Sequence, residues 1–318
     1  MHLATLIHQG RRRLVSRPDA EGEWRLAPLP ATLAGVIADG VLPAGDGEPL
    51  DDGERGDDGE RGDGGERGDG GAQAGGRGAP VLPYRPATLY GIGLNYRDTI
   101  AEMGRQAPSE PYLFPKLSSS VIGPGEAVVL DPELTRRVDW ETELAVVIGA
   151  EARHVTEEDA PRHVFGYTVA NDISARDLQE RDGQWVRGKG LDTFCPLGPV
   201  VVTADAIPDP HALRVRTWVN GERVQDGTTA DMVFRIPQLI AYLSRFFTLR
   251  PGDVVLTGTP AGCGDYMSPP RALRPGDLLE SEVEGIGRLV NPVRRAAAEG
   301  ASTEGAGAVR PRQVAGGR

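Results

Sequence analysis

A run of apolar residues rich in β-branched side chains spans residues 144–148 and ends at a glycine. This length and composition predict a buried strand. The polar stretch directly before it, residues 139–143, contains Glu141 and Glu143. Because alternate side chains of a strand lie on one face, we expect the two carboxylates to point in the same direction. An isolated Glu-x-Glu pair is most often the solvated face of an edge strand, whereas a pair in a partly dry place needs a positive partner.

Hydrophobic patterning elsewhere predicts many short strands and few helices. The clearest helix is residues 236–247, where apolar residues recur at i, i+3, i+4 and i+7 behind Pro237. Asn220-Gly221 is a strong hairpin signal, and two Pro-Gly turns launch further strands. Other strands are predicted at residues 3–7, 13–15, 23–26, 88–96, 164–172, 199–203 and 215–219, and short helices at residues 32–37, 97–103 and 156–160. The pattern therefore predicts a mainly β (α+β) fold.

Changes in composition divide the chain into four parts. Residues 1–43 predict a small N-terminal β-rich domain. Residues 44–79 repeat the unit Gly-Glu-Arg-Gly-Asp with a six-residue period, which predicts a disordered, acidic, Gly-rich linker. Residues 80–295 form the large domain that carries the motifs described below. Residues 296–318 are rich in Ala, Gly and Arg and predict a disordered tail.

Composition and charge exclude several classes of protein. The 318 residues are 39% hydrophobic and 25% charged, and much of the net charge of −11 comes from the acidic repeat, so no basic surface for nucleic acid is indicated. The sequence has no apolar run long enough to cross a membrane, and its first residues are too polar for a signal peptide, which predicts a cytoplasmic protein. The two cysteines are far apart and favour neither a disulfide framework nor a zinc site.

The basic residues give a further clue. Only Lys116 and Lys189 are lysines among the 35 basic residues. A lysine ammonium is a compact charge with an adjustable pKa, which arginine cannot replace in a catalytic site, so both lysines are catalytic candidates. The alternative is that both are ordinary surface lysines.

A third carboxylate, Asp172, lies at the end of the strand predicted at residues 164–172. Together with Glu141 and Glu143 it would form a site of hard oxygen ligands, which suits Mg²⁺ or Mn²⁺, with Ca²⁺ as a less favoured possibility. Spacing along the chain does not by itself establish that Asp172 meets the other two carboxylates.

Six sequence motifs follow one another along the large predicted domain. They are Gly-Leu-Asn-Tyr-Arg-Asp (93–98), Leu-Phe-Pro-Lys (113–116), Asp-Trp-Glu-Thr-Glu-Leu-Ala-Val-Val-Ile-Gly (139–149), Gly-Tyr-Thr-Val-Ala-Asn-Asp-Ile-Ser-Ala-Arg-Asp (166–177), Lys-Gly-Leu-Asp-Thr-Phe-Cys-Pro-Leu-Gly-Pro (189–199) and Leu-Thr-Gly-Thr-Pro-Ala-Gly (256–262). Together they resemble the fumarylacetoacetate hydrolase family, in its branch of acylpyruvases and 2-hydroxyhepta-2,4-diene-1,7-dioate isomerases. The resemblance runs in order from about residue 86 to residue 293.

The resemblance implies a β-sandwich roll as the catalytic domain, in a protein that is usually a homodimer. It implies a Mg²⁺ or Mn²⁺ site formed by the residues that match Glu141, Glu143 and Asp172. It also implies a substrate pocket lined by the matching residues Arg176, Gln179, Lys189 and Thr259.

The chemistry implied by the resemblance begins with a 2-oxo acid or acylpyruvate that chelates the metal ion. The ion then stabilises the enolate that forms when a C–C bond breaks or a proton moves. In hydrolytic members of the family, a His followed three residues later by a Glu activates water, but this chain has Thr99 and Glu102 at those positions. A threonine hydroxyl is not a base near neutral pH. We therefore expect either that Glu102 acts alone or with Lys116 near it, or that the enzyme favours proton shuttling or decarboxylation.

Three functions remain open at this stage. The first is a metal-dependent hydrolase or lyase that cleaves a C–C bond of a 2-oxo or diketo acid. The second is an isomerase or decarboxylase of a 2-hydroxy-dienoate or 2-oxo acid, as in aromatic catabolism. The third is a non-catalytic descendant that binds a metal or small ligand. In each case the partner is a small molecule and not a nucleic acid or a membrane.

Overall fold

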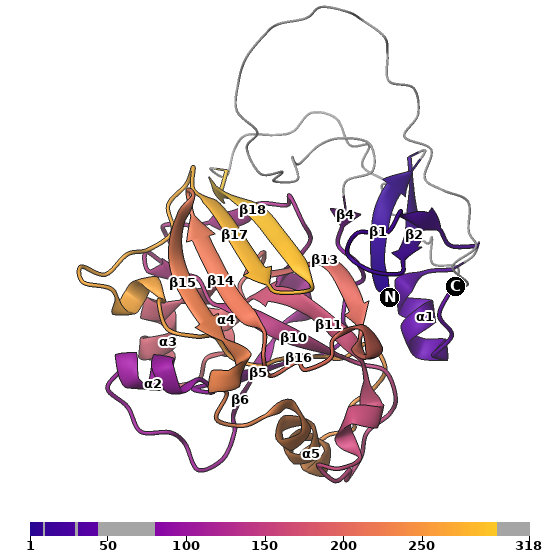
Figure 1. Cartoon of the computed structure of the whole chain (residues 1–318). Coiled ribbons are helices and arrows are strands. Elements are labelled where there is room, and N and C mark those ends of the chain that lie inside the picture. Colours follow the sequence, from indigo (N-terminus) through magenta and orange to yellow (C-terminus); the bar gives the residue numbers. More distant parts are fainter. Residues whose placement is uncertain (9, 29–30, 44–79, 298–318) are drawn as a thin grey trace, which may run out of the picture.

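The computed structural model describes residues 1–8, 10–28, 31–43 and 80–297. Within them, two β-sheets form the body of the molecule and the helices are few and short (Figure 1). The expected mainly β fold is confirmed. The disorder predicted for residues 44–79 lies outside the described residues, as does nearly all of the predicted tail.

The larger sheet has eleven strands, nine of which follow one another across it. In spatial order they are β3 (Arg25–Leu26), β2 (Arg11–Arg17), β1 (His2–His8), β13 (Cys195–Thr203), β11 (Val164–Asn171), β10 (Thr142–Ile148), β16 (Val254–Leu256), β5 (Leu89–Gly93) and β6 (Tyr112–Lys116). The short strands β4 (Pro80–Val81) and β7 (Val121–Ile122) pair with β1 and β13. Strand β10, which follows Glu141, therefore lies well inside the sheet.

A five-stranded sheet packs against the middle of the larger one, on β10, β11 and β13 (Figure 1). Its order is β15 (Glu222–Thr228), β14 (Arg214–Val219), β17 (Leu278–Val283), β18 (Gly287–Arg295) and β8 (Val128–Leu130). The hairpin predicted at Asn220-Gly221 joins β14 to β15, and Asn220 has the positive φ of 55° that such a turn requires. A separate sheet of two short strands consists of β9 (Val138–Asp139), which precedes Glu141 and Glu143, and β12 (Ser174–Ala175), which follows Asp172.

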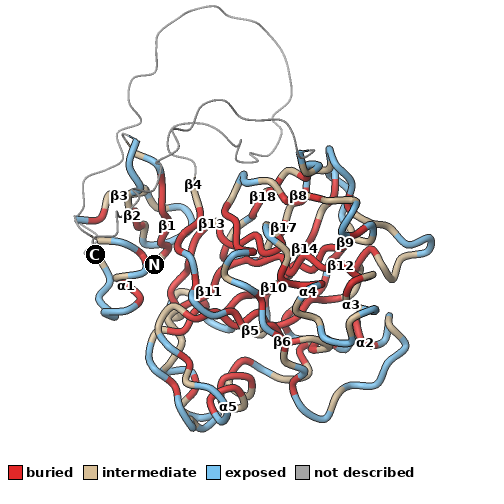
Figure 2. The backbone as a smooth tube through the Cα atoms, turned by 180° about the vertical axis from the view of Figure 1, so that it is seen from behind, coloured by how far each residue is buried: buried red, intermediate tan, exposed pale blue. Residues whose placement is uncertain are grey.

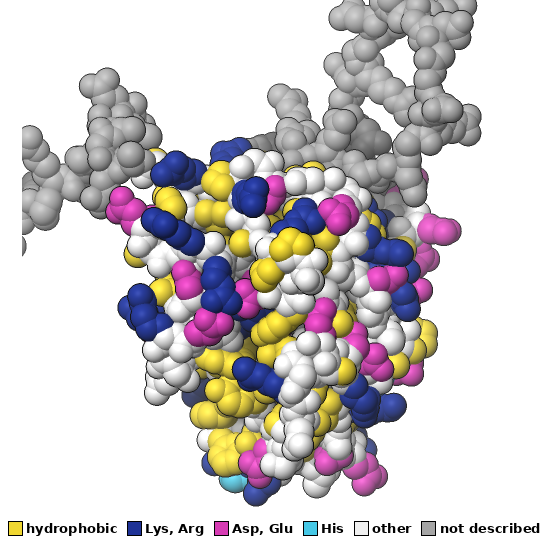
Figure 3. Space-filling model, turned by 90° about the vertical axis from the view of Figure 1, so that its left-hand side faces the viewer, with side chains coloured by type: hydrophobic (Ala, Val, Ile, Leu, Met, Phe, Trp, Pro, Cys, Tyr) yellow, Lys and Arg dark blue, Asp and Glu magenta, His cyan; other side chains and the backbone are white. Residues whose placement is uncertain are grey.

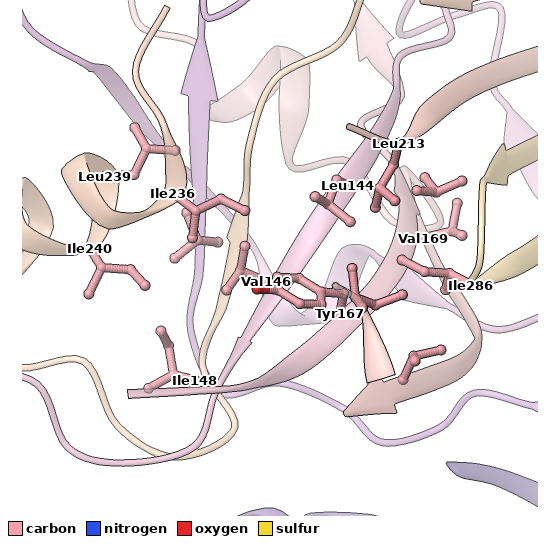
Figure 4. Packing of buried hydrophobic residues seen from close by; sticks show 14 of the residues in the cluster. Leu144, Val146, Ile148, Tyr167, Val169, Leu213, Ile236, Leu239, Ile240 and Ile286 are labelled. Atoms are coloured by element: carbon pink, nitrogen blue, oxygen red, sulfur yellow. The ribbon is translucent and has the colours of Figure 1, made fainter. Parts of the chain in front are cut away.

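Both faces of β10 are buried, which explains why its sequence is almost continuously apolar. Leu144, Val146 and Ile148 pack into the core between the sheets and against helix α5 (Ile236–Phe246) (Figure 4). Ala145 and Val147 point to the opposite face, into a second core with helix α1 (Leu33–Asp39). Figure 2 shows buried residues concentrated in these central strands and exposed residues on the outer loops.

The remaining helices are short. They are α2 (Arg97–Glu102), α3 (Arg176–Asp182) and α4 (Val186–Lys189), together with the 3₁₀ turns η1 (Ser118–Ser120), η2 (Ala160–His163), η3 (Ala204–Ala206), η4 (Thr229–Asp231) and η5 (Gly264–Tyr266). The helix predicted at residues 156–160 is wrong. A single turn closes there, with the Ala160 N–H donating to the Thr156 carbonyl at 3.0 Å, and Pro161 has no N–H to continue it.

The N-terminal strands continue the larger sheet. Strand β1 pairs with β13 through His2 and Leu3, opposite Val202 and Val201. The division of the chain into domains at residues 43 and 79 stays a prediction, but the strands of residues 1–43 share a sheet with those of the large domain.

Candidate active site around a buried carboxylate cluster

Pairing between β10 and β11 brings the three predicted carboxylates together. The strands are antiparallel with Thr142 opposite Asn171, so the start of β10 lies beside the end of β11. The Asp172 N–H donates to the Glu141 carbonyl at 2.8 Å. Carboxylate oxygens of Glu141, Glu143 and Asp172 lie within 4.8 Å of one another, and all three residues are buried. The two glutamates therefore point in the same direction, as expected, and they are not a solvated edge.

Both lysines of the chain reach this cluster. The Lys189 ammonium lies 2.6 Å from Glu141 Oε2 and 2.6 Å from Asp172 Oδ2, and Lys116 Nζ lies 2.5 Å from Asp172 Oδ1. Both side chains are almost completely buried. Burial alone would raise the pKa of Asp172, but the two ammonium groups outweigh it and lower that pKa. Burial likewise disfavours the charged form of Lys189, and the carboxylates outweigh it and raise its pKa. The alternative of two ordinary surface lysines is excluded.

Glu143 is the member of the cluster without a cationic partner among the described residues. Its carboxylate accepts a hydrogen bond from the Gly258 N–H at 2.6 Å. Burial, together with the charges of Asp172 and Glu141, raises its pKa well above the ordinary value. Three buried carboxylates, one of them uncompensated and with no His or Cys among them, match the hard oxygen ligands that a divalent cation such as Mg²⁺ or Mn²⁺ prefers. The residues present therefore fit a divalent metal ion.

Arg176 connects the cluster to a fourth buried acid, Asp139. Its guanidinium lies 2.6 Å from Glu141 Oε1 and donates two hydrogen bonds to Asp139 Oδ2, at 2.9 and 2.7 Å. Asp139 also accepts backbone N–H groups of Gly264 and Asp265, at 2.7 and 3.2 Å. Asp139 therefore fixes both Arg176 and the segment around η5 at the edge of the site.

A cavity of about 420 Å³ opens onto the cluster. Six of the predicted residues line it, namely Glu141, Glu143, Arg176, Gln179, Lys189 and Thr259. The structure does not bring the other three to the cavity wall: Asp172, although a member of the cluster, is fully buried, Lys116 is buried against it, and Glu102 is exposed outside the cavity. Their individual roles stay predictions.

Helix α2 places Thr99 on the cavity wall. The Thr99 hydroxyl donates to the Thr259 carbonyl at 2.7 Å, so its proton is committed to the protein. The Glu102 carboxylate accepts the Gly262 N–H at 3.1 and 3.2 Å. Partial burial is the largest cause that raises the pKa of Glu102 above its ordinary value of about 4.5. The expected proximity of Lys116 to Glu102 is not found, because Lys116 is held by Asp172 and the Ile173 carbonyl.

Sequence reasoning did not assign several residues that line the cavity. Apart from Thr99, they include Arg105, Tyr112, Trp185, Cys263 and Tyr266. The rings of Tyr112 and Trp185 pack with their centroids 4.5 Å apart and their planes tilted by 44°, and together they form an aromatic part of the cavity wall. Asp139 begins one of the motifs and Cys263 directly follows another, so the motifs could have indicated both residues. Arg105 lies outside every motif.

One face of the molecule carries charges of both signs. Figure 3 shows the face at the left-hand side of Figure 1, where basic and acidic side chains are interspersed with hydrophobic ones between them. Within the part of the chain that the structure describes, no helix is long and apolar enough to cross a membrane.

Comparison with known proteins adds names to this architecture. The family model for the fumarylacetoacetate (FAA) hydrolase C-terminal region matches residues 88–294. Oxaloacetate tautomerase FAHD2A of Homo sapiens, named as mitochondrial, is 50% identical over 217 residues, which cover 68% of this chain and 68% of that protein. The solved fumarylacetoacetate hydrolase of Exiguobacterium antarcticum is 36% identical with a TM-score of 0.79, over 93% of this chain and 100% of that one. The 5-carboxymethyl-2-hydroxymuconate delta-isomerase of Mycobacterium smegmatis is 32% identical with a TM-score of 0.72, over 93% of this chain and 100% of that one.

Proposed function

The chain is an enzyme of the fumarylacetoacetate hydrolase family, and from its site we propose that it is a divalent-metal-dependent tautomerase that interconverts the keto and enol forms of a 2-oxo acid such as oxaloacetate. The name of the human relative, which is 50% identical, supports this substrate. Proton transfer, rather than C–C cleavage, thereby becomes the favoured reaction, which reverses the order expected from the sequence alone.

The observation that carries the proposal is the position of Thr99. This residue lies on the cavity wall where hydrolytic members of the family are expected to have a histidine. Its hydroxyl donates to the Thr259 carbonyl at 2.7 Å, and it has no basic nitrogen that could take a proton from water. A reaction that only moves a proton needs no activated water as nucleophile, so it is compatible with this wall.

The residues of the cavity suit the binding and polarisation of a 2-oxo acid. A divalent ion held by Glu141, Glu143 and Asp172 would offset negative charge on the carboxylate and 2-oxo oxygens of the substrate. Lys189 donates a hydrogen bond to the 2-oxo oxygen, on which negative charge develops as the C3 proton leaves. Arg176, whose guanidinium Asp139 holds, orients the substrate carboxylate.

Our candidate for the group that exchanges the C3 proton is Glu102, which stands outside the cavity wall and would therefore act on the substrate through water. In the keto-to-enol direction the C3–H bond breaks, the proton passes through water to the Glu102 carboxylate, and the electron pair of that bond forms the C2–C3 double bond. The 2-oxo oxygen then takes a proton from solvent. A raised pKa suits Glu102 for this exchange, because a base works best when its pKa approaches the working pH.

Cleavage of a C–C bond remains a second candidate. The fumarylacetoacetate hydrolase of Exiguobacterium antarcticum is 36% identical with a TM-score of 0.79, and the cluster of three carboxylates is intact here. A cytoplasmic location and a homodimer stay predictions.

The test follows enol absorbance of oxaloacetate with purified protein and Mg²⁺, against Mg²⁺ alone and against EDTA. We expect the protein to accelerate keto–enol exchange only with metal, without release of pyruvate, and the Glu141→Gln variant to behave like the protein-free control. Rapid pyruvate release from oxaloacetate would replace the proposal with a decarboxylase. Release of pyruvate and an acid from an acylpyruvate, with no tautomerisation, would replace it with a hydrolase.

A further inference from the structure

Arg105 lies on the cavity wall, three residues after Glu102, the last residue of α2. Gly104 has a φ of +61°, and the Arg105 N–H donates to the Ile100 carbonyl at 3.0 Å. This left-handed glycine with a backward hydrogen bond is a common helix end, and it turns the chain so that Arg105 lines the cavity. Within the described residues, the Arg105 side chain makes no hydrogen bond and no ion pair.

The other cations of the cavity wall are already paired. Arg176 is bound to Asp139 and Glu141, and Lys189 is bound to Glu141 and Asp172.

Two acids of the cavity wall, Glu180 and Asp265, share one arginine, so this group of three side chains keeps one negative charge. Arg137, which does not line the cavity, lies 2.7 Å from Glu180 and 2.8 Å from Asp265. Among the cationic side chains of the described cavity wall, Arg105 is therefore the one whose charge has no partner. An anionic group of a ligand would find an unpaired cation there.

We propose that Arg105 binds the second carboxylate of a dicarboxylic 2-oxo acid and selects such acids over monocarboxylic ones. This inference rests on the proposed function, since it assumes that the first carboxylate and the 2-oxo group lie at the cluster. An arginine presents a planar fork of donors that matches a carboxylate with two parallel hydrogen bonds, which suits it to this role. A monocarboxylic acid leaves that fork in water and gains nothing from it.

The kinetic test compares Arg105→Gln with wild type on oxaloacetate and on phenylpyruvate, a monocarboxylic 2-oxo acid that also enolises. The matched control is Arg294→Gln, which removes the same charge from an exposed arginine on β18. We expect Arg105→Gln to raise the KM for oxaloacetate at least about tenfold, with kcat and the phenylpyruvate constants within about twofold of wild type. Arg294→Gln should change neither substrate.

Binding provides a readout that does not depend on turnover. Calorimetry with Mg²⁺ would compare 3,3-difluoro-oxaloacetate, which has no C3 proton and cannot enolise, with oxalate, which has a chelating end but no distal group. Arg105→Gln should weaken binding of the first at least about tenfold and leave oxalate unchanged. Equal effects on both ligands, or none on either, would overturn the role of Arg105. Failure of wild type to tautomerise either 2-oxo acid would instead overturn the proposed function.

Discussion

Substituting Glu143→Gln should stabilise the metal-free protein and abolish its stabilisation by Mg²⁺. The substitution keeps an oxygen that can accept the Gly258 N–H but removes a buried negative charge from the cluster. Glu143 has a raised pKa because burial and its two carboxylate neighbours disfavour its charged form. Without metal, the charge of Glu143 therefore lowers the free energy of unfolding, and its loss should raise it.

The size of the effect follows from the geometry. At an effective dielectric constant of about 20, two unit charges 4.8 Å apart repel by about 3.5 kcal/mol. Glu143 has two such neighbours, and Lys189 offsets part of their repulsion. We expect a net gain of about 2 kcal/mol, which for a protein of this size raises Tm by about 4–8 °C. A metal ion at a hundred times its Kd should stabilise wild type by about 2.7 kcal/mol, a rise of similar size.

Thermal unfolding with EDTA and with Mg²⁺ provides the assay, with Glu151→Gln as a control for the loss of one exposed carboxylate. The order of stability should invert. In EDTA the Glu143→Gln variant should have the higher Tm, whereas Mg²⁺ should raise the Tm of wild type and leave that of the variant unchanged. The reasoning is refuted if the variant melts below wild type in EDTA, or if Mg²⁺ raises the Tm of both proteins equally.

Three further predictions concern the residues around the cluster. Glu102→Gln should lower kcat for tautomerisation by about 10²–10⁴-fold. In wild type, kcat/KM should fall with decreasing pH as Glu102 is protonated, at a pKa raised above about 4.5. If the variant still shows this fall in kcat/KM at low pH, Glu102 is excluded as the base. Thr99→His should raise hydrolysis of an acylpyruvate by exchanging a hydroxyl bound to the Thr259 carbonyl for a base, and product analysis that finds no gain would mean that position 99 does not limit attack by water. Asp139→Asn should lower the free energy of unfolding by about 1.5–3 kcal/mol, because it weakens the charged hydrogen bonds to Arg176 and leaves Glu141 as the remaining carboxylate partner of that buried guanidinium. A loss below about 1 kcal/mol in denaturant titrations would contradict that account.

Much of the fold could be predicted because its signals are local. The apolar run of β10, the Asn220-Gly221 turn and the spacing of α5 each act within a few residues, and the structure has an element at each. The pairing of strands is not local. Nothing near His2 indicates that β1 joins β13, some two hundred residues later. The order of the sheet therefore could not be derived from hydrophobic patterning.

The site divides in the same way. Glu141 and Glu143 could be paired from the two-residue period of a strand, but Asp172 joins them only through the register of β10 and β11. That register was available only through the resemblance to a family. The chain's two lysines could be singled out because they are rare, and both lie on the cluster. Arg105 could not be singled out, because its distinction is the absence of a partner, which depends on where all other charges lie.

The charges of the site relate the proposed metal ion to the two lysines. Lys116 and Lys189 balance two of the three carboxylates, and the pair of Arg176 and Asp139 is neutral by itself, so with all three carboxylates ionised the metal-free cluster would keep one negative charge. That charge would repel an anionic substrate. A divalent ion reverses the sign and leaves one positive charge, which the carboxylate of a 2-oxo acid neutralises. A second carboxylate must then find its own cation, and the described cavity wall offers Arg105 for it.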